Sequence, residues 1–151
     1  ENPRIPFYAG VALERLTDAK AAKEQYEKSV ALKPSFKEPR FALGRILKNE
    51  GKNLEARPHL EAVVEADVKN TSARLMLAEI CEALGVLDDA EFQFKEIINQ
   101  HPENPYNQHR LAQFYERTGQ NNKAKALFKA TEKAAPTKPS KKLRPLQPSK
   151  K

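Results

Sequence analysis

The sequence lacks tryptophan, and it has one methionine and one cysteine among 151 residues. The single cysteine, Cys81, cannot form an internal disulfide, which excludes the small disulfide-stabilised scaffolds. No apolar run approaches the roughly 20 residues that a membrane-spanning helix needs. No signal peptide is visible, but the chain opens with Glu1 rather than Met, and we expect it to be a segment of a longer protein. We interpret it as a soluble chain and slightly favour the cytoplasm over the periplasm.

Signals of catalysis are also missing. There is no Gly-rich phosphate loop and no Ser-centred elbow. His59, His101 and His109 lie in different predicted helical elements without metal-ligand spacing, so polar surface positions explain them better than a metal site. The neighbouring carboxylates Asp88 and Asp89 are typical of a helix start, not of an acid/base pair. The sequence predicts no enzyme, no metal, no cofactor and no small-molecule substrate.

Charge is distributed unevenly. Six of the 27 Lys and Arg residues lie in 137–151, which holds no acidic residue, so the rest of the chain carries 21 basic and 20 acidic residues. The basic residues of this tail are Lys138, Lys141, Lys142, Arg144, Lys150 and Lys151. Its prolines and serines predict a disordered, solubilising tail. Two alternatives stay open. The positive charge could attract the tail to nucleic acid or to an anionic lipid surface, or a polyproline-binding domain could recognise Lys142, Pro145 and Pro148.

One pattern recurs every 34 residues. Its central slot always holds alanine, at Ala22, Ala56, Ala90 and Ala124. Twelve residues earlier the side chain is always small, at Gly10, Gly44, Ala78 and Ala112. Four residues after the alanine it is large and apolar, at Tyr26, Leu60, Phe94 and Phe128. The closing slot holds Pro34, Val68, Pro102 and Pro136. A fixed period of this length is typical of stacked-repeat architectures.

Each copy contains two apolar runs with helical spacing, separated by a turn signal. In the third copy these runs cover about 71–84 and 88–101, and Gly85 ends the first of them. Small residues allow two helix backbones to approach closely, and the large residue fills the space beside them. Each copy is therefore predicted to be an antiparallel helix pair that buries its other face against a neighbour.

At these residues the chain resembles the tetratricopeptide repeat family. The resemblance covers roughly 3–136 and implies an all-α, right-handed solenoid of four helix pairs, at 3–36, 37–70, 71–104 and 105–136, followed by the tail at 137–151. There are departures from the family pattern. The tryptophan slot near the start of each copy holds Pro6, Arg40, Arg74 and Gln108. Thr17 stands where Gly51, Gly85 and Gly119 end the first helix of the other copies, and Val68 replaces the closing proline.

Three local features carry expectations of their own. Cys81 occupies a slot that is apolar in the other copies, which predicts a core residue rather than a reactive thiol. Pro58 lies inside a predicted helix and favours a frayed or tightened start over a break. The first helix, about 3–16, is apolar nearly all round, so we expect either further helices before it or self-association through it.

The resemblance implies a concave groove lined by the first helix of each pair. Carried over by position, the partner-binding residues are Phe7, Tyr8, Val11, Phe41, Arg45, Leu75, Met76, Glu79, Tyr106, His109, Arg110 and Gln113. Phe7, Phe41 and Leu75 fall on one row, which is an apolar ladder suited to an amphipathic helix or an extended peptide. Arg45, Arg110 and Arg117 are expected to rim it, and Arg45 and Arg110 are expected to orient acidic groups. The alternative is that the phenylalanines only pack between neighbouring first helices.

The motif of the co-chaperone modules that bind a C-terminal carboxylate is absent. The corresponding positions hold Phe7, Val11, Ala42, Ser72 and Met76, or, one copy later, Phe41, Arg45, Met76, Tyr106 and Arg110. The sequence thus predicts a protein-interaction scaffold with an unknown protein or peptide partner. The rival hypothesis is an adaptor whose tail contacts membrane or nucleic acid, with the repeats as a spacer.

Overall fold

The computed structural model describes residues 1–134, with side chains described through residue 131. This part of the chain contains eight α-helices and no strand. The helices are α1 (Arg4–Arg15), α2 (Ala19–Leu32), α3 (Lys37–Asn49), α4 (Asn53–Ala66), α5 (Thr71–Ala83), α6 (Leu87–Gln100), α7 (Pro105–Arg117) and α8 (Asn121–Ala134). The two helices predicted in the third copy are present, with ends within one residue of the expected positions. The predicted all-α fold is confirmed.

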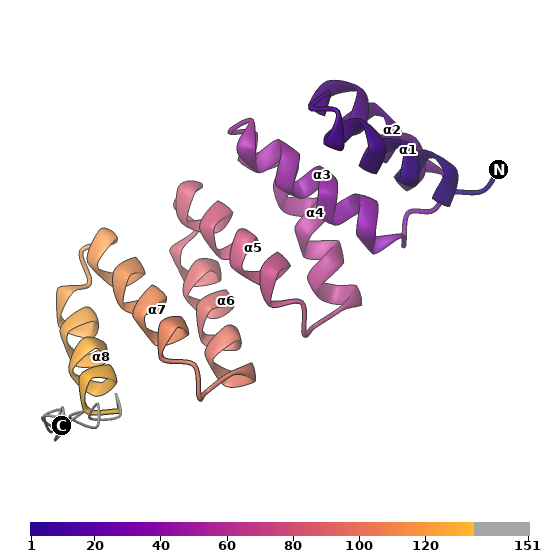
Figure 1. Ribbon diagram of the computed structural model, residues 1–151. Helices are drawn as coiled ribbons and strands as arrows, with labels where there is room; N and C mark the ends of the chain where they lie inside the picture. The colour runs from indigo at the N-terminus through magenta and orange to yellow at the C-terminus, as the bar shows by residue number, and fades with distance from the viewer. Residues whose placement is uncertain (135–151) are drawn as a thin grey trace, which may run out of the picture.

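Consecutive helices pack as pairs, and the pairs follow one another in a curved row from the N-terminus to the C-terminus (Figure 1). The second helix of each pair packs on the first helix of the next, because α2 contacts α3, α4 contacts α5 and α6 contacts α7. There is therefore no single closed core. We use the predicted ranges 3–36, 37–70, 71–104 and 105–136 as units one to four below.

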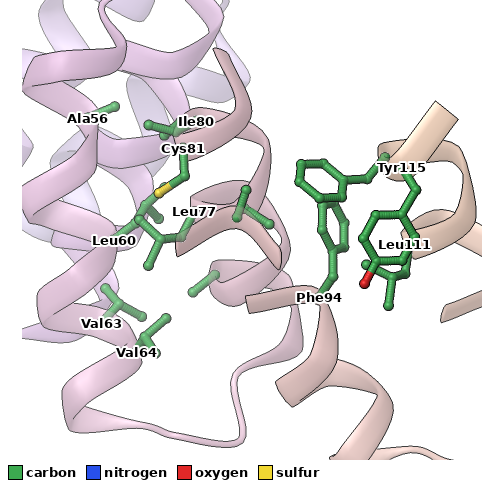
Figure 2. Close-up of a cluster of buried hydrophobic side chains, with 14 of the residues drawn as sticks. Ala56, Leu60, Val63, Val64, Leu77, Ile80, Cys81, Phe94, Leu111 and Tyr115 are labelled. Atoms are coloured by element: carbon green, nitrogen blue, oxygen red, sulfur yellow. The ribbon is translucent and has the colours of Figure 1, made fainter. Parts of the chain in front are cut away.

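Apolar residues from neighbouring units form the core. Figure 2 shows Leu60 of α4 beside Leu77 and Cys81 of α5, all of them buried. Farther along, the rings of Phe94 and Phe114 lie 5.4 Å apart between α6 and α7. Cys81 is 1% exposed, and burial raises the pKa of its thiol above the ordinary value. The prediction that Cys81 belongs to the core is thus confirmed.

Helix ends follow local side-chain chemistry. The Asp18 and Asn70 side chains accept hydrogen bonds from the Ala21 and Ala73 amides, which satisfies free N–H groups at the starts of α2 and α5. The C-terminal ends of α3, α5 and α7 are followed by glycines with positive φ, at Gly51, Gly85 and Gly119. Thr17 follows α1 with φ 62°, so threonine adopts the same left-handed conformation as the glycines it replaces. The departure at Thr17 changes the residue but not the turn.

Pro58 does not interrupt α4. The helix runs continuously from Asn53 to Ala66, and its first turn is closed by the bond from the Ala56 amide to the Lys52 carbonyl, at 2.9 Å. Neither a frayed nor a tightened start is therefore observed, and the helix is not broken, as expected. Pro58 is exposed, so the carbonyl one turn earlier that loses its intrahelical donor lies in a part of the helix open to water.

Candidate functional site

The first helices of units one and two form a hollow of about 440 Å³, called here the α1–α3 hollow. Four of the predicted groove residues line it, namely Phe7, Val11, Phe41 and Arg45. Phe7 and Phe41 are each partly buried, so both keep solvent-accessible surface. Phe7 is held in place by aromatic neighbours, with ring centroids 6.0 Å from Tyr26 and 5.3 Å from Phe36. The hollow therefore has a preformed aromatic wall.

Two adjoining hollows lie between α5 and α7 and share Phe94, Tyr106 and Arg110, and together they are called the α5–α7 hollow. Leu75 lines its apolar part, and Glu79 and Gln113 line its polar part. Leu75 lines a different hollow from Phe7 and Phe41, so the expected apolar ladder is divided between two hollows. Each hollow is also lined by a second helix, through Val63 of α4 in the α1–α3 hollow and Phe94 of α6 in the α5–α7 hollow.

Three of the predicted groove residues line neither hollow. Tyr8 is 64% exposed, and its ring lies 5.2 Å from that of Phe7. Met76 packs against the core cluster. His109 packs against Phe128 with the rings tilted by 58° and their centroids 5.3 Å apart. These three positions remain predictions without support from the shape of the surface.

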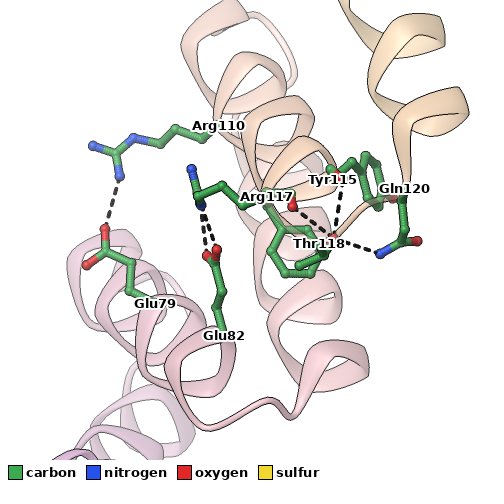
Figure 3. A network of polar contacts seen from close by, with 8 residues as sticks. Glu79, Glu82, Arg110, Tyr115, Arg117, Thr118 and Gln120 are labelled. Atoms are coloured by element: carbon green, nitrogen blue, oxygen red, sulfur yellow. Dashed lines mark hydrogen bonds and ion pairs between the residues drawn. The ribbon is translucent and has the colours of Figure 1, made fainter.

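Each arginine expected to rim the groove already has a carboxylate partner on the preceding unit. Arg45 of α3 donates to Glu14 of α1. Figure 3 shows Arg117 of α7 donating through Nε and Nη2 to Glu82 of α5, at 2.6 and 2.9 Å, and Arg110 donating more weakly to Glu79, at 3.5 Å. An acidic ligand group must therefore compete with these carboxylates. Arg110 has the longest of the three contacts.

Arg110 has further partners in the α5–α7 hollow. Its guanidinium donates to the Tyr106 hydroxyl at 3.1 Å and lies over the Tyr106 ring, 4.8 Å from the centroid. Glu79 also forms an ion pair with Lys48 of α3, with 2.8 Å between the carboxylate oxygen and Nζ. The carboxylate of Glu79 is thus shared between two cations, which leaves Arg110 only partly neutralised.

The position pattern missed residues that come from second helices and loops. The α1–α3 hollow is also lined by Tyr26, Val63, Asp67 and Asn70. Lys37 donates to Asp67 at 3.0 Å across its rim, and this contact lowers the pKa of Asp67 and raises that of Lys37. The large-residue slot that contains Tyr26 could have indicated its place. Nothing in the repeat pattern indicates Asp67 or Asn70.

Other reactive groups do not converge. Within residues 1–131, no group of three or more His, Cys, Asp or Glu side chains is arranged to hold a metal ion. His59 is partly buried and its Nδ1 has no hydrogen-bond partner, and burial together with the positive charge of Arg40 lowers its pKa.

In the described part of the chain, none of the helices has both the length and the apolar character required for a membrane span. The predicted tail, with Lys138, Lys141, Lys142, Arg144, Lys150 and Lys151, lies outside the described residues.

Comparison with solved structures gives the same fold. The structure of MamA AMB-1 is 25% identical over 88% of this chain and 78% of its own, with a TM-score of 0.77. MamA residues 41-end from Desulfovibrio magneticus RS-1 is 22% identical over 92% and 78%, with a TM-score of 0.78. YrrB, described as a TPR protein with an unusual peptide-binding site, is 22% identical over 90% and 70%, with a TM-score of 0.77. No curated protein sequence matches the chain.

Family models match most of the sequence. One tetratricopeptide repeat model matches residues 47–106 and 87–143, and a second matches residues 9–36. These matches include parts of all four units, and they agree with the resemblance inferred from the spacing of small, large and proline residues. The chain belongs to the tetratricopeptide repeat family.

Proposed function

We propose that the inner surface of the first helices binds a segment of another protein and that the chain acts as a non-catalytic interaction scaffold. The observation that carries this proposal is the α1–α3 hollow, where Phe7 and Phe41 are both partly exposed and share one concavity with Val11. A concave apolar wall of this kind receives apolar side chains of a ligand, since burying them removes apolar surface from water.

The rim of the α1–α3 hollow favours a peptide as the ligand rather than an entirely apolar molecule. Charges of both signs flank it, in the pairs Lys37 with Asp67 and Arg45 with Glu14. These groups can exchange partners with the polar backbone and side chains of a bound segment. An apolar centre surrounded by a polar rim is the usual anatomy of a protein interface.

The arginines of the α5–α7 hollow favour a ligand that carries an acidic group at a second position. Arg110 is bound to Glu79 at 3.5 Å, which is long for a charged hydrogen bond, and its neighbour Arg117 is 52% exposed in its side chain. A ligand carboxylate entering this hollow would meet both guanidinium groups. We therefore propose a ligand with an apolar anchor for the α1–α3 hollow and an acidic residue for the α5–α7 hollow. The peptide-binding site ascribed to YrrB makes peptides the first ligand class to test, although that likeness concerns the fold alone.

The test is selection of ligands from a library of random 12-residue peptides displayed on phage, followed by fluorescence anisotropy with the selected peptides. Phe41→Ser should weaken binding by at least tenfold, because the ligand loses the wall against which its anchor packs. Phe92→Ser is the matched control, since Phe92 is an exposed aromatic residue of α6, at 56%, that lines neither hollow. Circular dichroism establishes that both variants remain helical.

Removal of residues 137–151 separates this proposal from the rival tail hypothesis. Binding that survives the deletion and depends weakly on salt supports the groove, whereas complete loss supports the tail. Peptides that bind the Phe41→Ser chain as tightly as the parent would contradict a role for the α1–α3 hollow.

A further inference from the structure

The outer face of α1 carries a stripe of four apolar residues. Ile5, Ala9, Ala12 and Leu16 follow one another at intervals of four, three and four, which places them on one side of the helix. The two ends of the stripe are open to solvent, because Ile5 is 69% and Leu16 is 74% exposed. These four residues are called the α1 stripe.

The equivalent positions of the later units are covered. Ile5 corresponds to Pro39, Ala73 and Asn107, all of which are buried. Ala12, which is exposed, corresponds to Ile46, Ile80 and Phe114, none more than 5% exposed. In those units the second helix of the preceding pair packs against this face, and among residues 1–134 no helix does so for α1. The fold thus covers this face with a helix in every later unit.

The α1 stripe nevertheless differs from the covered faces in two ways. Arg40 and Arg74 donate to the carbonyls of Pro34 and Val68 in the preceding connection, whereas the equivalent residue of unit one is Pro6, which has no side-chain donor. The sizes are also reversed. The later units have large residues in the middle of the stripe, such as Leu77 and Ile80. The α1 stripe has alanines in the middle and large residues at its ends, so its closest approach to another helix is at its centre.

This arrangement is symmetric along the helix. Ile5 and Leu16 lie at equal distances on either side of the point between Gly10 and Val11, and so do Ala9 and Ala12. If a second α1 lies antiparallel across this point, each Ile5 faces the other Leu16, and each Ala9 faces the other Ala12. The same patch then serves both partners, as an isologous two-fold interface requires.

A neighbouring hollow can receive the bulky ends. A concavity of about 600 Å³ adjoins the stripe and is lined in part by Ile5, Pro6, Ala9 and Leu32. In the antiparallel arrangement, Leu16 of the second copy is brought to this end of α1.

We propose that α1 pairs with α1 of a second copy of this chain, antiparallel about a two-fold axis that passes between Ala9 and Ala12. The pairing is independent of ligand binding in the groove, because Ile5, Ala12 and Leu16 line neither groove hollow. The second copy covers apolar surface that the rest of the array covers with its own second helices.

Analytical ultracentrifugation of the full 151-residue chain tests the pairing. The mass should rise from 17.1 kDa toward twice that value with increasing concentration. Ile5→Asp and Leu16→Asp should each raise the dissociation constant at least tenfold, and neither should unfold the chain, since both side chains are exposed. Phe92→Asp, at an exposed site on α6, is the matched control and should leave the mass profile unchanged. A chain that stays monomeric at every concentration overturns the proposal, as does a dimer insensitive to both substitutions.

Disulfide trapping tests the antiparallel arrangement. An equimolar mixture of Ala9→Cys and Ala12→Cys chains should form cross-linked dimers faster than either chain alone. In the antiparallel arrangement, Ala9 of one copy faces Ala12 of the other copy, not the other Ala9. The unsubstituted chain controls for Cys81, which is buried and should not react. Equal rates in the mixture and in the separate chains would overturn the antiparallel pairing. Phe41→Ser should leave trapping unchanged, which separates failure of this proposal from failure of the groove proposal.

Discussion

A Cβ atom on Gly10 of α1 would lie 2.6 Å from Cε1 of Tyr26 on α2, so the tyrosine ring packs directly on the backbone of the neighbouring helix. Unit two repeats the relationship, with 2.6 Å between a Cβ on Gly44 and Cγ of Leu60. Tyr26 and Leu60 are fully buried. The slot reserved for small residues therefore sets how closely the helices of a pair approach in these two units.

Gly44→Ala should lower the free energy of unfolding. Alanine gains about 1 kcal/mol over glycine inside a helix, but overpacking against a fixed neighbour costs about 1–3 kcal/mol. We expect a net loss of up to about 2 kcal/mol, measured by urea denaturation. The control is the same substitution in a Leu60→Ala background, where the space is free and Gly44→Ala should be neutral or stabilising. An equal loss in both backgrounds would show that the Leu60 contact is not the cause.

Thr17→Gly should stabilise the chain by about 1 kcal/mol, because a β-branched residue is strained at positive φ. Thr17 has φ 62°, close to the 75° of Gly51 at the equivalent position. The converse change, Gly51→Ala, should destabilise by a similar amount, and it isolates the backbone term because nothing lies within 4 Å of a Cβ at that position. Thermal unfolding of both variants checks the pair. A Thr17→Gly chain less stable than the parent would contradict this account and would point instead to the hydrogen bond from the Thr17 hydroxyl to the Leu16 carbonyl.

These positions show why the fold could be predicted from the sequence. Gly10, Gly44 and the alanines of the central slot recur because backbone contact leaves no room for larger side chains. A constraint that every unit shares appears as a period of 34 residues, and the period alone gives the helix pairs and the core. Thr17 could be recognised as a turn residue only through its place in the register.

The partners of the charged groove residues could not be predicted in the same way. Glu14 pairs with Arg45 across one unit boundary, and Lys48 pairs with Glu79 across the next at the same spacing but with the signs exchanged. A contact that keeps its geometry and changes its residue types leaves no periodic signal. The division of the apolar ladder also leaves no periodic signal, because it depends on which residues of the second helices and connections line each hollow.

Acidification should destabilise the chain through His59. Burial, and next the positive charge of Arg40, lower the pKa of His59 in the folded state below its ordinary value of 6.5. The unfolded chain therefore binds this proton first, so stability is lost as pH falls through about 6.5 toward the lower folded pKa. His59→Gln should reduce this loss, and glutamine is suitable because Gln25 and Gln93 occupy the equivalent positions of units one and three. Urea denaturation between pH 7.5 and about 5 measures it, with His101→Gln at an exposed site as the control. An identical pH dependence in the parent and His59→Gln chains would exclude His59 as the origin.

Glu91 should stabilise the packing of unit four on unit three until the solution becomes strongly acidic. Its carboxylate accepts hydrogen bonds from Tyr115 of α7 at 2.9 Å and from Lys123 of α8 at 3.2 Å. Hydrogen bonds lower the pKa of Glu91 to about 2, and the one from Lys95 of α6 has the largest effect. Because the folded pKa lies below the ordinary value of 4.5, the stabilisation is complete above about pH 4.5 and is lost as pH falls toward 2.

Glu91→Gln should therefore cost about 1–3 kcal/mol at neutral pH, since the charge is lost while the Tyr115 hydroxyl remains largely buried. Hydrogen exchange should accelerate in α7 and α8 before it does in α3 and α4, because the broken contacts join unit three to unit four and the units contact only their neighbours. Glu65→Gln, at an exposed site on α4, is the control and should change neither pattern. Uniform acceleration along the whole array would contradict the local role of Glu91 and would mean that the units unfold as one.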